Sequence, residues 1–366
     1  MRVACLGGGP AGLYLGISLK LRNRDHDVLV VERNRPSDTF GWGVVLSDVT
    51  LDNLEANDPV SAAAIRDNFA YWDDIAVVHA GHRTVSTGHG FCGIGRKRLL
   101  ELLQTRAREL GVRMEFEREV SSTSEFSDYD VVVGADGLNS RVRAEHEAHF
   151  RPDIDRRLCK FVWLGTKQKF DDAFTFIFEK TEHGWVWAHA YQFDEDTATF
   201  IVETSEDTWR RFGFGDMTKE ESGAVCERIF AEHLGGHALM NNAQHLRGSA
   251  WLNFPRVLCD QWHHDNVVLL GDSAATAHFS IGSGTKLAME SAISLAGHLD
   301  REGPLDARLS AYQEERKIEV LRLQSAARNS MEWFEQVERY LDQHPVQFNY
   351  ALLTRSQRIS HENLRL

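Results

Sequence analysis

Cysteine is scarce in this chain of 366 residues, and its arrangement excludes several common uses of the thiol. The five cysteines are Cys5, Cys92, Cys159, Cys226 and Cys259. Because their number is odd and no two of them form a Cys-x-x-Cys pair, we expect neither a disulfide framework nor a zinc site of that type. Free thiols are typical of a reducing compartment, so we expect a cytoplasmic protein.

Long apolar runs and an excess of positive charge are also missing. No stretch approaches the roughly 20 apolar residues that a membrane-spanning helix needs, and residues 1–6 lack the apolar core of a signal peptide. Asp and Glu number 54 against 41 Lys and Arg, a net charge of −13, whereas nucleic acid binding needs a basic face. We therefore expect a soluble protein with neither a membrane nor a nucleic acid as partner.

Signatures of metal-dependent or covalent catalysis are absent from the sequence as well. The 17 histidines are scattered, and there is neither a His-Glu-x-x-His helix nor a Ser-His-Asp order. No metal site is expected. The composition, with 42% hydrophobic and 26% charged residues, is that of an ordinary globular protein, and the length allows one large domain or two closely joined ones.

The first of three glycine- and acid-bearing segments lies near the N-terminus. Gly7-Gly8-Gly9-Pro10-Ala11-Gly12 follows a predicted strand at residues 2–6 and opens a predicted helix at residues 11–22. A second strand at residues 28–31 completes a βαβ unit and leads to Glu32, which is placed to bind ribose hydroxyls. Because glycines in such a turn let a pyrophosphate approach the positive start of the helix, the segment predicts a site for NAD or FAD. The expected contacts are Gly7, Gly9, Pro10, Ala11, Gly12, Glu32 and Arg33.

The second segment, residues 134–143, distinguishes between these two cofactors. From Asp136 to Arg143 it reads Asp-Gly-x-x-Ser-x-x-Arg. In this it resembles the class A flavoprotein aromatic hydroxylases, which have a single FAD-binding Rossmann domain. The resemblance implies that Asp136 and Gly137 lie near the FAD pyrophosphate and also serve NADH or NADPH, for which the chain offers no second glycine fingerprint. A capping aspartate at a glycine-rich strand end is the alternative interpretation of Asp136.

The third segment, Gly271-Asp272-Ser273, runs on to Gly282-Ser283-Gly284. In the resembling family the acid binds the ribityl chain of FAD, and the later glycines bring backbone amides to the flavin ring at a helix start. The expected contacts are Gly271, Asp272, Gly282, Gly284 and Thr285. Ala275, Phe279 and Lys286 stand where His, Pro and Asn are usual in the family, so we expect a specialised wall on the substrate side.

Two further elements complete the expected FAD contacts. A well-patterned helix is predicted at residues 96–110, and the resemblance implies that its leading Arg96 contacts the FAD phosphates. Trp42 and Gly43, in the string Phe-Gly-Trp-Gly-Val-Val at residues 40–45, join the expected set. A solvated arginine at a helix start is the alternative for Arg96.

Four strings narrow the subfamily. Residues 40–45 and 278–285 resemble two related groups, the tryptophan hydroxylases of violacein biosynthesis and the monooxygenases of coenzyme A thioesters. The second group includes salicylyl-CoA 5-hydroxylase and the monooxygenase half of 2-aminobenzoyl-CoA monooxygenase/reductase. Residues 88–97 and 354–365 favour the thioester group.

The order of predicted elements indicates an α/β fold with a Rossmann-like FAD domain, an inserted antiparallel-sheet substrate domain and C-terminal helices. From about residue 160, aromatic-rich strands alternate with charged turns, and a long charged helix follows at 305–341 before a turn-prone tail from Pro345. The predicted domains are FAD-binding at 1–159, with a substrate-domain excursion near 75–95, substrate-binding at 160–258, FAD-binding at 259–304, and helical at 305–366.

The resemblance also implies the reaction. NADH or NADPH reduces FAD, O2 is the co-substrate, and a flavin 4a-hydroperoxide delivers oxygen to an electron-rich ring. Attack at ring carbon 5, para to a hydroxyl or amino group, is helped by a neighbouring proton acceptor. Candidate acceptors are His89, His189 and His278, followed by Tyr191 and Glu203, and the candidates to sandwich the ring are Trp42, Trp187 and Phe279. A purely structural role is the alternative for each of them.

Three functions remain open from the sequence. The expected substrate is a small aromatic molecule, either a 2-hydroxy- or 2-aminobenzoyl-CoA thioester or, alternatively, tryptophan or another indole. The third possibility is a flavin reductase or oxidase without oxygen insertion. The Asp-Gly motif and the lack of a second glycine fingerprint for a nicotinamide cofactor argue against it. The chain is expected to act as a monomer or homodimer.

Overall fold

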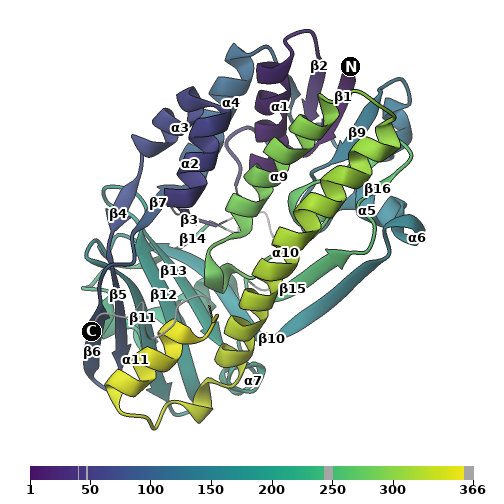
Figure 1. The fold of residues 1–366 in the computed structure, drawn as a ribbon. Coiled ribbons are helices and arrows are strands. Elements are labelled where there is room, and N and C mark those ends of the chain that lie inside the picture. Colours follow the sequence, from purple (N-terminus) through teal and green to yellow (C-terminus); the bar gives the residue numbers. More distant parts are fainter. Residues whose placement is uncertain (40, 47, 243–249, 358–366) are drawn as a thin grey trace.

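Two halves make up the molecule, each built on its own large sheet (Figure 1). The computed structural model describes residues 1–39, 41–46, 48–242 and 250–357. Six strands form the first sheet and eight strands the second, and a three-stranded sheet lies beside them. This arrangement confirms the expected α/β fold with a Rossmann-like domain, an inserted sheet and C-terminal helices.

The six-stranded sheet forms because short runs of valine and leucine are buried on both faces. Its pairings are parallel except at the edge, where β16 (His263–His264) runs antiparallel to β17 (Val267–Leu269). The helix α1 (Pro10–Arg22) packs against α9 (Gly284–Leu299) and α4 (Arg96–Glu109). In spatial order the strands are β16 (His263–His264), β17 (Val267–Leu269), β9 (Val131–Gly134), β1 (Arg2–Leu6), β2 (Asp27–Val31) and β8 (Arg113–Glu115).

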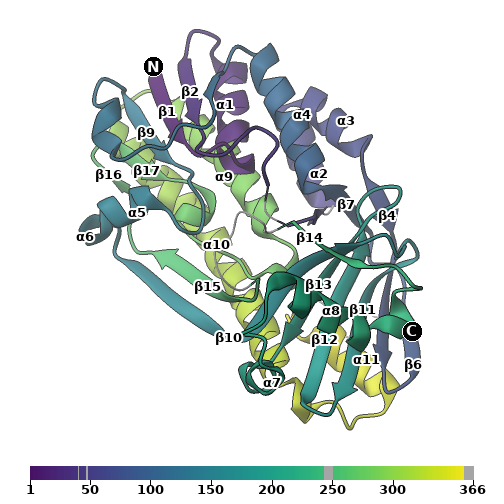
Figure 2. The ribbon, with the colours of Figure 1, turned by 180° about the vertical axis from the view of Figure 1, so that it is seen from behind.

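The eight-stranded sheet carries the aromatic residues of the second half. Its pairings are antiparallel except that β5 (Asp74–His79) lies parallel to β11 (Ala173–Thr181), so the segment at 74–86 joins the sheet formed mainly by residues 152–204. In order the strands are β14 (Leu239–Asn241), β10 (Pro152–Thr166), β13 (Ala198–Thr204), β12 (Gly184–Gln192), β11 (Ala173–Thr181), β5 (Asp74–His79) and β6 (His82–Ser86), with β15 (Leu252–Cys259) paired to β10. Figure 2 shows the β10–β15 pair running from one half to the other.

Both faces of this second sheet are covered by helices. On one face, the core residues Phe200, Phe214 and Phe230 pack together beside α8 (Lys219–Ile229). On the other face, Phe176 and Trp187 pack against Phe334 from the C-terminal helices. The covering is possible because residues on successive positions of each strand point to opposite faces.

A small sheet and several short helices connect the halves. The small sheet has the order β3 (Gly43–Leu46), β7 (Phe91–Gly95) and β4 (Ala70–Trp72), and β7 leads directly into α4. Apart from the two C-terminal helices, the other α-helices of the described residues are α2 (Asp48–Asn57), α3 (Pro59–Arg66), α5 (Arg141–Glu145), α6 (Glu147–Phe150) and α7 (Glu206–Phe212). The short 3-10 helices are η1 (Thr123–Phe126), η2 (Ala231–His233), η3 (Gly271–Ser273), η4 (Phe279–Ile281) and η5 (Val337–Arg339).

The C-terminal region differs from the expected turn-prone tail. The helix α10 (Leu305–Glu335) runs along both halves in Figure 1, and α11 (Pro345–Thr354) then folds back onto the second sheet. Pro345 begins this helix rather than ending the structure, because a proline lacks only an N–H that the first helical turn leaves unpaired anyway. The expectation of a tail from Pro345 was wrong.

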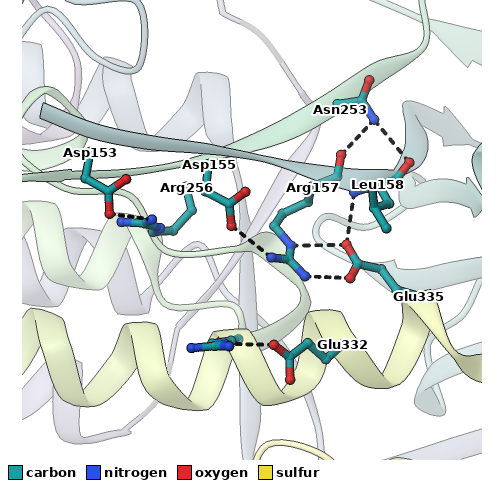
Figure 3. A network of polar contacts seen from close by, with 9 residues as sticks. Asp153, Asp155, Arg157, Leu158, Asn253, Arg256, Glu332 and Glu335 are labelled. Carbon is teal, nitrogen blue, oxygen red and sulfur yellow. Dashed lines mark hydrogen bonds and ion pairs between the residues drawn. The ribbon is translucent and has the colours of Figure 1, made fainter.

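A buried ion pair fixes α10 to the long strand β10 (Figure 3). The guanidinium of Arg157 meets the carboxylate of Glu335 at two points, Nε to Oε1 at 3.1 Å and Nη2 to Oε2 at 2.5 Å. The backbone N–H of Leu158 also donates to Oε1, at 2.9 Å. Only 16% of the Arg157 side chain and 8% of the Glu335 side chain are exposed, so the contact is an internal one that joins the end of α10 to β10.

None of the helices in the described residues is both long and apolar enough to cross a membrane. Within the same ranges, no group of three or more His, Cys, Asp or Glu side chains is arranged to hold a metal ion.

Candidate active site

A cavity of about 540 Å³ lies where the two halves meet, and it brings the three glycine-bearing segments together. One side comes from Gly9, Pro10 and Ala11 at the start of α1 and from Asp272 and the 282–285 segment at the start of α9. The other side is aromatic and comes from the second sheet. Its members are Trp163, Phe174, Phe176, His189 and Tyr191. The cavity therefore joins a polar, glycine-rich wall to an aromatic one.

A second cavity of about 200 Å³ adjoins the first on the nucleotide-binding side. The two cavities share Gly9, Ala135 and Gly137 as lining residues. Expected contacts that line the second cavity are Gly7, Glu32, Arg33 and Asp136. Together the cavities form an elongated space that runs from the end of β2 to the aromatic wall.

The first glycine segment turns so tightly that side chains are excluded at two positions. A Cβ on Gly7, whose φ is +123°, would lie 2.1 Å from the carbonyl oxygen of Ala135, and a Cβ on Gly12 would lie 2.0 Å from that of Gly7. The turn is held by Glu32, whose Oε2 accepts from the N–H of Gly8 at 2.7 Å. The carboxyl ends of β1, β2 and β9 consequently open into the same space, as in dinucleotide-binding folds.

In the second segment, Asp136 caps the following helix. Its carboxylate accepts from the hydroxyl of Ser140 at 2.5 Å and from the N–H groups of Arg141 and Val142 at 2.7 and 3.2 Å. Asp136 therefore caps the helix, as the alternative interpretation predicted, and it also lines the second cavity. These hydrogen bonds fix the backbone of Gly137, which faces both cavities.

In the third segment, Asp272 faces Arg96 across the larger cavity, which both residues line. Burial raises the pKa of Asp272, and the charges of Arg96 and Arg143 partly offset this rise. Burial likewise lowers the pKa of Arg96, with Asp272 acting against it. The Asp272 side chain is exposed to the space of the cavity and Arg96 is half-buried, and the protein around the cavity lets the two charges act over a longer range than they would at an open surface.

Two helix starts supply donors that fit FAD. The N-cap residues of α1 and α9 are Gly9 and Ser283, and neither gives its helix a side-chain cap, so the first N–H groups are left to other acceptors. Both starts line the larger cavity. A Cβ on Gly9 would meet nothing within 4 Å, which leaves room for a group against the backbone. One start can hold phosphate oxygens and the other the oxygen-rich edge of a flavin, so the residues present fit the cofactor.

Of the three candidate proton acceptors, His189 occupies the aromatic wall of the cavity. Its Nε2 lies 3.1 Å from Oε2 of Glu203, which also accepts from Nε1 of Trp187 at 2.8 Å. Burial lowers the pKa of His189, and the Glu203 carboxylate partly offsets this effect. Trp187 and Glu203 do not line the cavity but lie behind His189, so among the described residues they orient this ring and have no direct access to a ligand.

The other two candidate histidines lie in different surroundings. His89 lines the cavity, and its Nε2 lies 2.8 Å from Oγ of Ser86. Its pKa is lowered by burial, against the pull of Asp73 and Asp74. His278 is buried and does not line the cavity; its Nδ1 accepts from the N–H of Ser280 at 3.2 Å, which caps the turn that carries Phe279. Burial holds the pKa of His278 well below its ordinary value.

Some of the expected aromatic contacts line the cavity and others do not. Phe279 lines the cavity, and so does Tyr191, whose hydroxyl donates to the carbonyl oxygen of Gly43 at 2.8 Å. Burial raises the pKa of Tyr191 to about 12, so the phenol is neutral. Trp42 instead packs on β10, where a Cβ on Gly165 would lie 2.6 Å from its ring. Gly43 lines the cavity without Trp42.

Of the three departures from the family pattern, Phe279 lines the cavity, whereas Ala275 and Lys286 are not among its described lining residues. Arg355, which no sequence pattern predicted as a site residue, reaches the cavity together with Leu353 and Ser356. The available signal was the string 354–365, which the resemblance singled out without assigning a role. Phe40 and residues 358–365 of the quoted strings lie outside the described residues.

Comparisons with known proteins agree with this geometry. A family model described as FAD binding domain matches residues 1–325. The chain is 43% identical to salicyloyl-CoA 5-hydroxylase of Streptomyces sp over 97% of its own length and 70% of that protein. It is 34% identical to protodeoxyviolaceinate monooxygenase of Chromobacterium violaceum over 92% of its length and 90% of that protein.

The fold itself recurs in solved structures. One is the tetrameric form of 2-methyl-3-hydroxypyridine-5-carboxylic acid oxygenase, with a TM-score of 0.73 at 20% identity, covering 97% of this chain and 95% of that one. The chain belongs to the FAD binding domain family and is a flavin-dependent aromatic monooxygenase, with FAD as cofactor, NADH or NADPH as electron donor and O2 as co-substrate.

Proposed function

We propose that this monooxygenase hydroxylates carbon 5 of a benzoyl-CoA thioester that carries a hydroxyl or amino group at carbon 2. The main support is the 43% identity to salicyloyl-CoA 5-hydroxylase across nearly the whole chain. The aromatic wall with His189 facing the glycine-rich wall supports it too, since a ring bound between them lies beside a proton acceptor.

In this proposal the cavities divide FAD between them. Glu32 and Arg33 hold the adenosine ribose, the starts of α1 and α4 hold the pyrophosphate through Gly9 and Arg96, and Asp272 holds the ribityl chain. The 282–285 segment then borders the ring. When bound, FAD supplies the activation of O2. Gly137, exposed to both cavities, is the proposed approach for the nicotinamide donor.

The residues of this chain have two tasks during hydroxylation. The wall of Phe174, Phe176 and Phe279 holds the ring and excludes water, so that activated oxygen is not lost to solvent. His189 accepts the proton of the ring substituent as charge develops, with Glu203 fixing the orientation and tautomer of the imidazole. The five cysteines are all free and buried, which fits the proposed cytoplasmic setting, and a monomer or homodimer remains the proposed assembly.

The test compares three substrates side by side. Substrate-stimulated oxidation of NADH and of NADPH is followed with salicyloyl-CoA, 2-aminobenzoyl-CoA and tryptophan, and products are identified by mass. A thioester that accelerates oxidation and gains one oxygen supports the proposal. Acceleration by tryptophan alone would favour the indole alternative, for which the 34% identity to protodeoxyviolaceinate monooxygenase is the supporting observation. Peroxide without hydroxylated product would instead indicate a reductase or oxidase.

A further inference from the structure

Arg355 places a positive charge on the wall of the substrate cavity from the far end of the chain. Its Nε donates to Oγ of Ser330 at 2.9 Å, its Nη1 to the carbonyl oxygen of Leu352 at 2.6 Å and its Nη2 to that of Ser280 at 2.9 Å. A guanidinium has five N–H groups. These three neutral acceptors hold the side chain in place and leave N–H groups for a ligand in the cavity.

The charge of Arg355 is poorly compensated by the protein. Burial lowers the pKa of Arg355 to about 10. Within the described residues, the carboxylate that opposes this shift is Glu203, which acts through its charge and not through a hydrogen bond. Glu203 is itself engaged with Trp187 and His189. A recessed cation of this kind is stabilised when a negatively charged or electron-rich oxygen comes within hydrogen-bond distance.

Arg355 and His189 meet at the same two aromatic rings. The guanidinium carbon lies 5.2 Å from the centroid of Phe176 and 5.2 Å from that of Phe334. The imidazole of His189 lies 5.0 Å from the same two centroids. Because both side chains also line the cavity, one substituent on a bound ring can contact the guanidinium and the imidazole together.

The two side chains have opposite hydrogen-bonding capacity. Arg355 can only donate. Because the Glu203 carboxylate lies beside Nε2 of His189, that nitrogen carries the proton and Nδ1 is left as an acceptor. A hydroxyl satisfies both partners, since its oxygen accepts from Arg355 while its proton points to Nδ1. An aromatic amino group can donate to His189, but its lone pair is delocalised into the ring and is a poor acceptor for Arg355.

We propose that Arg355 binds the oxygen of the ring hydroxyl at carbon 2 and thereby selects a 2-hydroxybenzoyl substrate over a 2-aminobenzoyl one. This inference rests on the proposed function, whose substrate class it narrows. Because the guanidinium also holds the carbonyl of Ser280, next to Phe279, it fixes the position of the bound hydroxyl relative to the flavin-side loop.

The test uses ligands without coenzyme A, so that it can be read apart from the thioester proposal. The FAD-containing enzyme is titrated with salicylamide, 2-aminobenzamide and benzamide, which differ only at carbon 2, and the flavin absorbance is followed. Wild type is expected to bind salicylamide about tenfold or more tightly than the other two, the size of a hydrogen bond to a charged group. Arg355→Met and Arg355→Gln should abolish this preference, and Arg355→Lys should keep part of it.

Ser330→Ala is the matched control, because it removes one acceptor of Arg355 and keeps the charge. This variant should retain the preference for salicylamide. Equal binding of salicylamide and 2-aminobenzamide by wild type, or an unchanged preference in Arg355→Gln, would overturn the proposal; the wild-type comparison holds even if a variant fails to fold. An Arg355-dependent preference in an enzyme that leaves salicyloyl-CoA unmodified would keep this assignment and reject the thioester.

Discussion

The guanidinium of Arg143 donates a hydrogen bond of 3.0 Å to the carbonyl oxygen of Ser273, which is 130 residues further along the chain. A second N–H of the same group donates to the carbonyl oxygen of Leu138 at 2.5 Å. Arg143 is buried and lines neither cavity. The arginine of the second glycine segment therefore positions the third segment, and with it Asp272, without being placed to touch the cofactor.

The first prediction follows from this linkage. Arg143→Met leaves two carbonyl groups short of a donor, and we expect the free energy of unfolding to fall by about 2 kcal/mol, the cost of losing buried hydrogen bonds to a charged group. FAD retention should fall as well, because Asp272 is no longer held. Urea unfolding and the flavin-to-protein absorbance ratio measure the two effects.

Arg141→Met is the matched control, since that side chain is exposed and pairs with exposed Glu119. Its effect on unfolding should stay within about 0.5 kcal/mol. Equal destabilisation by the two variants would contradict the positioning role of Arg143.

Local sequence patterns were sufficient for the nucleotide-binding half. The glycines at 7 and 12 could be predicted because a side chain at either position would clash with the backbone, at Ala135 for Gly7 and at Gly7 itself for Gly12. Asp272 and Phe279 were found because their segment belongs to a recurrent motif, and both line the cavity. The roles of these residues toward FAD and substrate stay predictions.

Long-range packing decided what the sequence did not reveal. Arg355 enters the cavity because α11 docks on the second sheet through Phe348 and Leu352, and no local pattern encodes that docking. Pro345 was misjudged for a related reason, since proline both ends and begins helices and only the buried face of α11 shows which applies. The sequence predicted that Glu203 contacts the substrate, but the pairing of its strand with β12 places it behind His189.

The second prediction concerns FAD retention by Asp272. The carboxylate lines the cavity opposite Arg96, so Asp272→Ala removes both an acceptor for hydroxyl groups and the charge that balances the arginine. We expect the purified variant to be nearly colourless while wild type is yellow. Asp306→Ala, at a side chain that is 83% exposed, should purify with normal flavin content. A fully loaded Asp272→Ala enzyme would refute the role.

The third prediction tests the ion pair of Figure 3. Glu335→Gln removes the recessed carboxylate that pairs with Arg157 and leaves this guanidinium only the more exposed carboxylate of Asp155, at 2.9 Å. We expect a loss of about 3 kcal/mol in the free energy of unfolding. Replacing both partners, as Arg157→Met with Glu335→Leu, should cost less than either single change because no unpaired charge remains. Glu332→Gln, on the same helix, removes an exposed pair with Arg328 and should change stability little.

The fourth prediction concerns acid stability. The pKa of His278 lies well below its ordinary value in the folded protein, so the unfolded chain binds its proton first as the pH falls. The stability conferred by the neutral ring is fully present above the ordinary histidine pKa and declines below it, by at most about 1.4 kcal/mol per pH unit. Asparagine in His278→Asn can still cap the turn at Phe279. Between pH 7.5 and 5.5, the free energy of unfolding of this variant should fall less than that of wild type. An identical slope would place the acid sensitivity elsewhere.

The final prediction assigns the acid limb of the pH–rate profile to His189. Burial lowers its pKa, so the ring is neutral and able to accept a proton at pH 7, and the hydroxylation rate should fall only at pH values below the ordinary histidine range. Glu203 acts against the effect of burial. Glu203→Gln removes that charge, so the pKa of His189 should fall further, the acid limb should move to lower pH, and the plateau rate should drop because the base is weaker.

Trp187→Phe separates charge from packing in this experiment. The substitution removes the N–H that donates to Glu203 at 2.8 Å and leaves the carboxylate in place. The acid limb of Trp187→Phe should therefore stay close to that of wild type, because the charge beside His189 is unchanged, and should not follow the limb of Glu203→Gln. A limb that is the same in wild type and Glu203→Gln would mean that His189 is not the proton acceptor, and His89, the other candidate histidine on the cavity wall, would then be the residue to replace.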